Sequence, residues 1–179
     1  MPYTNLKTDY IMATTKFKGE PVSLAGEFVK VGAKAPDFKL VKTDLSTVSL
    51  GDFKGKRVIL NIFPSLDTKV CAMSVRQFNA RAASLPDTVI IAVSRDLPFA
   101  HERFCTTNGI NNVIPASDFR NYGFAEDYGV AMKDGALAGL LARAVVVIDK
   151  DGRVAYTELV PEITQEPDYD KAIESLKVH

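Results

Sequence analysis

The sequence predicts an α/β fold with a central mixed β-sheet flanked by helices, and three observations support this prediction. Two near-continuous apolar runs, 58–63 and 88–93, are each followed by a segment with helical spacing. A third run, 144–148, leads into the sequence DKDG at 149–152, which is typical of a tight hairpin turn. Buried strands joined by helices indicate parallel pairing, and the hairpin adds antiparallel strands to the same sheet.

Length and composition exclude several classes of protein. With 179 residues the chain suits one domain that buries its own core, and we expect neither a metal nor a cofactor. The 22 basic and 22 acidic residues balance without a basic stripe, so nucleic acid is not an expected partner. No apolar stretch approaches the ~18 residues of a membrane span, and the N-terminus lacks a signal-peptide core. We therefore expect a cytoplasmic protein without a membrane partner.

The N-terminal segment carries two signals. Residues 1–11 show little periodicity and Met12 opens a more coherent segment. We therefore expect 1–11 to be an extension or a cloning remnant that precedes a single domain at 12–179. The sequence KGEP at 18–21 separates two short extended runs, which predicts an N-terminal β-hairpin at about 15–31.

Periodicity and helix breakers place the remaining elements. Val75 and Phe78 recur at helical spacing after Thr68, and Pro86 marks the end of that helix. A second helix is expected to begin at Pro98 and to end at Cys105. Further strands are expected at 38–41, 47–49, 113–114 and 153–160, and further helical segments at 50–54, 117–128 and 168–177.

The most informative stretch is FPSLDTKVC at 63–71, where a strand breaks at Pro64 and a helix is predicted to begin after Thr68. Cys71 then lies in the first helical turn, where unpaired backbone N–H groups and the helix dipole favour a thiolate. Thr68 stands at capping-box spacing, so its hydroxyl is expected to meet the N–H of Cys71 and to hydrogen-bond the sulfur. A small buried structural cysteine is the alternative interpretation, against which Pro64 and Thr68 argue.

The chain has two cysteines, Cys71 and Cys105. A reducing cytosol argues against a permanent disulfide between them, so any bond that they form is expected to be transient and catalytic. A reactive cysteine just beyond the first central strand is typical of the thioredoxin-like fold, in which the motif is C-x-x-C. This chain has Thr68-Lys69-Val70-Cys71, so threonine replaces the first cysteine.

The pattern Pro64-x-x-x-Thr68-x-x-Cys71 on this architecture resembles the peroxiredoxins, and within them the bacterial thiol peroxidase subgroup of the atypical two-cysteine type. Further segments that resemble this subgroup are 60–76, 96–105, 112–114, 142–149 and 162–169. The resemblance implies a thioredoxin-dependent peroxidase of antioxidant defence, which reduces hydrogen peroxide and organic hydroperoxides. It also implies a homodimer packed through the active-site side, with 119–128 as a contributor.

The resemblance also implies a role for each matching residue. Cys71 is expected to be the peroxidatic cysteine, which becomes a sulfenic acid, and Cys105 the resolving cysteine, which condenses with it to a disulfide. Thr68 is expected to orient sulfur and peroxide, and Pro64 to shield the sulfur from solvent. Arg143 is expected to hold the thiolate and to stabilise charge during O–O cleavage. Because both cysteines lie on helices, local unwinding is predicted before they join.

Other functions remain open from the residues alone. A cysteine hydrolase requires a histidine, and the candidates are His179 and His101, the latter expected to be solvated. The same residues match no common zinc-site spacing. A redox-inert thioredoxin-like binding module and a thiol–disulfide oxidoreductase are the remaining alternatives. The oxidoreductase lacks its second motif cysteine at Thr68.

Side chains around the motif bear on substrate choice. Phe99, Leu137 and Leu140 are expected either to form an apolar rim that favours alkyl hydroperoxides or to be ordinary packing residues. Lys69 follows Thr68 directly and adds a positive charge beside the pocket. We expect this charge to affect either the choice of peroxide or the docking of the reductant.

Overall fold

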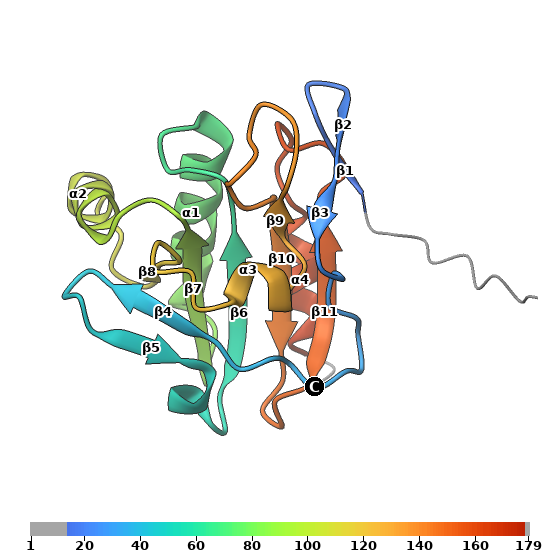
Figure 1. Cartoon of the computed structure of the whole chain (residues 1–179). Helices are drawn as coiled ribbons and strands as arrows, with labels where there is room; N and C mark the ends of the chain where they lie inside the picture. The colour runs from blue at the N-terminus through green and yellow to red at the C-terminus, as the bar shows by residue number, and fades with distance from the viewer. Residues whose placement is uncertain (1–13, 178–179) are drawn as a thin grey trace, which may run out of the picture.

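The computed structural model describes residues 14–177 and contains a seven-stranded mixed sheet with the order β11-β10-β6-β7-β8-β4-β5 (Figure 1). The strands are β4 (Lys39–Lys42), β5 (Thr47–Ser49), β6 (Arg57–Ile62), β7 (Thr88–Ser94), β8 (Ile114–Ser117), β10 (Ala144–Ile148) and β11 (Val154–Leu159). Strands β6, β7 and β8 are parallel, and the other neighbouring pairs are antiparallel. The predicted mixed sheet is confirmed.

Helices cover one face of the sheet. They are α1 (Lys69–Ala82), α2 (Pro98–Asn108) and α4 (Tyr169–Ser175), and a 3-10 turn, η1 (Leu50–Phe53), precedes β6. Figure 1 shows α1 and α4 side by side behind the sheet. Phe78 of α1 and Tyr169 of α4 meet edge to face, with ring centroids 5.2 Å apart. The apolar spacing predicted after Thr68 therefore faces the sheet.

The N-terminal hairpin is present but shorter than predicted. Strands β1 (Thr15–Phe17) and β2 (Glu20–Val22) are antiparallel and are joined by Lys18 and Gly19, whose φ angles are 50° and 83°. Two consecutive positive φ angles define the turn that matches the twist of a hairpin. The chain then leaves the hairpin, because β3 (Leu24–Ala25) pairs with β9 (Ala131–Met132) instead. The predicted extension at 1–11 lies outside the described residues.

The second face of the sheet is covered by β3, β9 and the short helix α3 (Phe124–Asp127). Phe124 and Tyr128 stack at 4.7 Å between centroids, and Phe38 meets Phe124 edge to face at 5.8 Å. Gly129 has a φ of 68°, and a Cβ atom there would lie 2.2 Å from the carbonyl carbon of Glu27. Glycine therefore permits the close approach of the two segments that build this face.

The predicted helix at 117–128 is wrong over most of its length. Ser117 is the last residue of β8, and α3 begins only at Phe124. Asn121 and Gly123 between them have positive φ angles of 52° and 96°, which a helix does not accommodate. Strand β8 also continues beyond the predicted 113–114, which moves the start of any helix further along the chain.

Helix α2 continues past its predicted end at Cys105. It runs to Asn108, and Gly109 closes it in the left-handed conformation with a φ of 64°. Cys105 therefore lies inside the helix. Its carbonyl accepts the backbone N–H of Ile110 at 2.9 Å.

The prediction that His101 is solvated is wrong. Its side chain is 1% exposed, and its Nε2 lies 3.0 Å from the hydroxyl of Ser94 at the end of β7. Nδ1 has no partner among the described residues. Burial lowers the pKa of His101 to about 4, and the nearby carboxylate of Asp96 opposes this effect.

The stability of the protein is expected to fall between pH 7 and pH 5 because of His101. The unfolded chain, with an ordinary histidine pKa near 6.5, takes up a proton before the folded chain, whose pKa is about 4. This linkage removes about 2 kcal/mol from the free energy of unfolding at pH 5. Urea unfolding at both pH values is expected to show that the free energy of unfolding of His101→Gln falls by less than that of the wild-type protein, and that the difference is this amount. The contributions of the carboxylates cancel because they are the same in both proteins. Equal losses in the two proteins would contradict the prediction.

Candidate active site

The register of the sheet brings two distant segments together. Ala144, the first residue of β10, pairs with Ile62, the last residue of β6. Because the two strands are antiparallel, Arg143 lies beside the segment that leaves β6 toward α1. Sequence positions 72 residues apart, Cys71 and Arg143, meet at this end of the sheet.

Cys71 is the third residue of α1 and is fully buried. Its Sγ accepts a hydrogen bond from Nη2 of Arg143 at 3.1 Å. The guanidinium is fixed from its other side, because Nε donates to the carbonyl of Ile163 at 2.7 Å. The remaining nitrogen, Nη1, is buried and has no partner among residues 14–177.

The charge of Arg143 is itself a constraint on the site. The side chain is 2% exposed, and none of the ion pairs formed within the described part of the chain includes it. A buried guanidinium is costly without a negative partner. The Cys71 sulfur is the side-chain acceptor that lies against this guanidinium, and Nη1 remains as an unpartnered donor.

Thr68 occupies the predicted N-cap position but not the predicted hydrogen bond. Its backbone is extended, with φ −97° and ψ 144°, and its carbonyl accepts the N–H of Ala72 at 3.0 Å. Its hydroxyl donates to the carbonyl of Ser65 at 3.0 Å and does not cap the N–H of Cys71. The predicted cap is therefore wrong, and because the hydroxyl proton goes to the carbonyl of Ser65 it is not donated to the sulfur. No hydrogen bond joins Thr68 to the sulfur among the described contacts.

A cavity of about 490 Å³ lies over this arrangement. Its lining includes three of the proposed site residues, Pro64, Thr68 and Arg143, together with Lys69. The other lining residues are Phe17, Lys18, Val70, Leu137, Ile163 and Thr164. Most of this lining is apolar, and the cationic side chains stand among it.

Several lining residues differ from those expected. Leu137 lines the cavity, whereas Phe99 and Leu140 do not. Phe17 and Ile163 were not predicted. Residue 16 forms a β-bridge with residue 162, which brings the N-terminal hairpin beside the segment after β11. No local sequence signal indicates this pairing of distant segments.

Cys105 has a different environment from Cys71. It is half-buried in α2 and packs against the apolar cluster that contains Cys71. Both cysteines are free thiols. Burial raises the pKa of Cys105 to about 11, so this thiol is protonated in the closed structure at neutral pH.

Within residues 14–177, no cluster of three or more His, Cys, Asp or Glu side chains is arranged to hold a metal ion. The same residues contain no helix that is long and apolar enough to cross a membrane.

Comparisons with known proteins identify the family of this chain. The Redoxin family model matches residues 30–173. Thiol peroxidases of Mycobacterium tuberculosis and Corynebacterium glutamicum are 56% and 52% identical over 165 residues, which cover 92% of this chain and 99% of each relative. A peroxiredoxin-like protein from Aquifex aeolicus, 47% identical, has a similar structure with a TM-score of 0.89, over 93% of this chain and 98% of that one. The chain therefore belongs to the Redoxin family, and its curated relatives are thiol peroxidases.

Proposed function

We propose that this chain is a thiol peroxidase that reduces hydroperoxides at Cys71. The contact between the buried Cys71 sulfur and Arg143 at 3.1 Å carries the proposal. The cation stabilises the attacking thiolate, and the unpaired Nη1 offers a second donor near the sulfur. Donors fixed before the reaction stabilise charge that develops on oxygen without reorganisation.

The first half of the cycle consumes one peroxide. The Cys71 thiolate attacks the terminal oxygen of the hydroperoxide, the O–O bond breaks, and the leaving oxygen takes a proton to become an alcohol or water. The sulfur is oxidised to a sulfenic acid and the peroxide is reduced by two electrons. Thr68 and Pro64, which line the cavity, are proposed to orient the peroxide and to limit the access of water.

The second half of the cycle uses Cys105. Its sulfur attacks the sulfenic sulfur of Cys71, a disulfide forms and water leaves. We propose thioredoxin as the reductant that then restores both thiols by exchange. Because this cycle requires a supply of dithiol reductant, we also propose a cytoplasmic location.

Substrate and assembly follow from the surroundings of the cavity. Phe17, Leu137 and Ile163 suit the alkyl group of an organic hydroperoxide, and the same site admits hydrogen peroxide. We propose a homodimer in which the segment at 119–128 contributes to the contact, since Phe119 and Tyr122 are exposed large aromatic side chains there.

Peroxide consumption with reduced thioredoxin tests the proposed function. Cys71→Ser is expected to abolish it, because serine does not supply the nucleophile. Cys105→Ser is expected to consume one equivalent of peroxide rapidly and then to stop, because the disulfide does not form. Turnover by Cys71→Ser, or none by the wild-type protein, would contradict the proposal.

Arg143→Gln is expected to slow the oxidation of Cys71 by about 10²- to 10³-fold, the usual effect of losing a fixed donor to a developing oxyanion. Arg143→Lys is expected to recover part of the rate, since it keeps the charge but loses the planar fork. Stopped-flow oxidation in the Cys105→Ser background measures this step. Arg153→Gln is the matched control, because Arg153 binds the carbonyl of Gly32 on an exposed surface. A rate for Arg143→Gln equal to that of the control would contradict the assigned role.

A further inference from the structure

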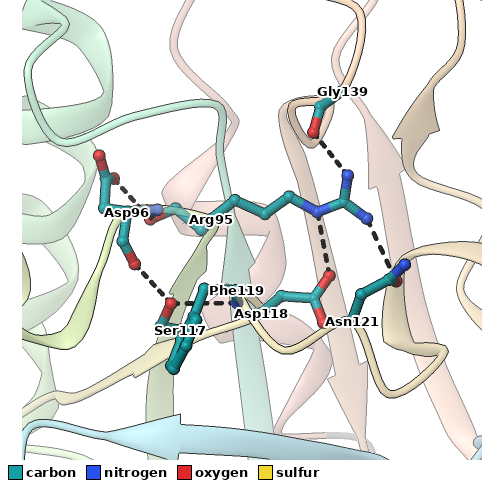
Figure 2. A network of polar contacts seen from close by, with 8 residues as sticks. Arg95, Asp96, Ser117, Asp118, Phe119, Asn121 and Gly139 are labelled. Atoms are coloured by element: carbon teal, nitrogen blue, oxygen red, sulfur yellow. Dashed lines mark hydrogen bonds and ion pairs between the residues drawn. The ribbon is translucent and has the colours of Figure 1, made fainter.

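The connection between β7 and α2 contains two charged residues with different partners. Figure 2 shows the side chains of Arg95 and Asp96 reaching in opposite directions from adjacent positions. Arg95 extends toward the carbonyl of Gly139 and the carboxylate of Asp118. Asp96 extends the other way, toward the loop that precedes Cys71.

The carboxylate of Asp96 accepts three hydrogen bonds. Oδ1 accepts the hydroxyl of Ser65 at 2.8 Å, and Oδ2 accepts the backbone N–H of Leu66 at 2.8 Å. Oδ2 also accepts the hydroxyl of Ser94 at 2.6 Å. Hydrogen bonds to an ionised acceptor are the strong ones. A single side chain at the start of α2 therefore fixes the loop that leads from β6 to α1.

The same contacts continue toward Cys71. The carbonyl of Ser65 accepts both the N–H of Thr68 at 3.2 Å and its hydroxyl at 3.0 Å. Thr68 is the N-cap of α1, and Cys71 lies in the first turn of that helix. The position of the Cys71 turn thus depends, through Ser65, on Asp96.

The contacts also continue into α2. Because the hydroxyl proton of Ser94 goes to Asp96, the oxygen of Ser94 is the acceptor for Nε2–H of His101. His101 lies one helical turn before Cys105 on α2. An unbroken series of hydrogen bonds therefore joins the helix of Cys105 to the loop of Cys71.

We infer that disulfide formation between Cys71 and Cys105 requires a turn of α1 or of α2 to open. Cys71 is fully buried within α1 and Cys105 is half-buried within α2. A disulfide needs their Cα atoms within about 7 Å and both Cβ atoms directed toward each other. Residues inside two helices reach that geometry when a helical turn opens, and the contacts of Asp96 oppose such opening.

We propose that Asp96 is a positioning residue that latches the loop at 64–68 to the start of α2. While the latch is closed, Cys71 is held for reaction with peroxide, and its opening permits the bond to Cys105. This inference rests on the proposed peroxidase function.

The latch sets the fate of the sulfenic acid. Resolution joins Cys71-SOH and Cys105-SH into a disulfide and releases one water, so no further oxidant is needed. In competition, a second hydroperoxide oxidises the sulfenic acid to a sulfinic acid and leaves as an alcohol or water. A latch that opens more often favours the disulfide, and one that opens less often favours the sulfinic acid.

Asp96→Asn tests the latch with a side chain of the same size. The asparagine amide is uncharged, and its NH₂ group replaces one carboxylate oxygen. A donor then faces a donor at a position where the carboxylate accepted a hydrogen bond. We expect oxidation of Cys71, measured in the Cys105→Ser background, to slow by about tenfold because the loop is less fixed. We expect disulfide formation after a single peroxide equivalent to accelerate by a similar factor and sulfinic acid, measured by mass spectrometry, to decrease.

Two further variants separate the latch from general destabilisation. Ser65→Ala removes the hydrogen bond from the Ser65 hydroxyl to Asp96. Because Asp96→Asn already weakens the same contact, the double variant is expected to resemble Asp96→Asn alone. Asp52→Asn is the matched control, because its carboxylate accepts the N–H of Ser49 at 2.9 Å at the start of η1. Amide hydrogen exchange of the reduced proteins at 65–72 is expected to accelerate in Asp96→Asn and not in Asp52→Asn.

The outcomes decide between the latch and its rivals. If Asp96→Asn slows both the oxidation of Cys71 and disulfide formation and also lowers the global stability, Asp96 has a merely structural role. Rates and exchange equal to those of Asp52→Asn would also overturn the inference. If the wild-type protein consumes no peroxide, the proposed function fails and exchange alone judges the latch. Faster exchange at 65–72 confined to Asp96→Asn then supports it, and unchanged exchange overturns it.

Discussion

The structure depends on a buried guanidinium that lies against a buried sulfur. Arg143 is buried. Its Nε donates to the Ile163 carbonyl and its Nη2 to the Cys71 sulfur, and Nη1 has no partner among residues 14–177. In such surroundings a charge interaction is stronger than in water, and an uncompensated charge is costly. The pairing of β6 with β10 supplies the position, since it places Arg143 next to the end of β6. The position of the guanidinium beside the Cys71 sulfur is therefore a consequence of sheet register.

The ends of β7 and β8 frame this interaction from both sides. Asp96, just after β7, holds the loop before Cys71. Asp118, just after β8, accepts a hydrogen bond from Nε of Arg95 at 3.3 Å (Figure 2). Arg95 in turn donates to the carbonyl of Gly139, in the loop that carries Leu137. Burial raises the pKa of Asp118 to about 6, against the opposing effect of Arg95. The two carboxylates thus each hold a loop that contributes to the lining of the cavity, and for Asp118 the effect of burial outweighs that of Arg95.

The sequence predicted what depends on local pattern and not what depends on distant partners. Apolar runs and breakers identified the central strands, the hairpin after β10 and the helix that begins after Thr68, because burial on one face imposes a period on the sequence. The helix expected at 117–128 failed because Asn121 and Gly123 adopt positive φ, which periodicity does not report. His101 was misjudged since its burial depends on the end of β7. The bond expected from Thr68 to the sulfur is absent since the carbonyl of Ser65 accepts the hydroxyl proton. Phe17 lines the cavity because the neighbouring residue 16 forms a β-bridge with residue 162, far away in the sequence.

The two cysteines differ in a way that would order the steps of the proposed cycle. Cys71 lies against a cation, whereas burial alone acts on Cys105 and raises its pKa to about 11. At that pKa only about one thiol in ten thousand is ionised at pH 7, so Cys105 is a poor nucleophile while α2 is intact. Exposure to water removes the cause of the shift and returns the thiol toward its ordinary acidity. In the proposed cycle, the opening that brings the two sulfurs within bonding reach would thus also activate Cys105. An intact α2 would keep Cys105 from reacting before Cys71 has met its peroxide.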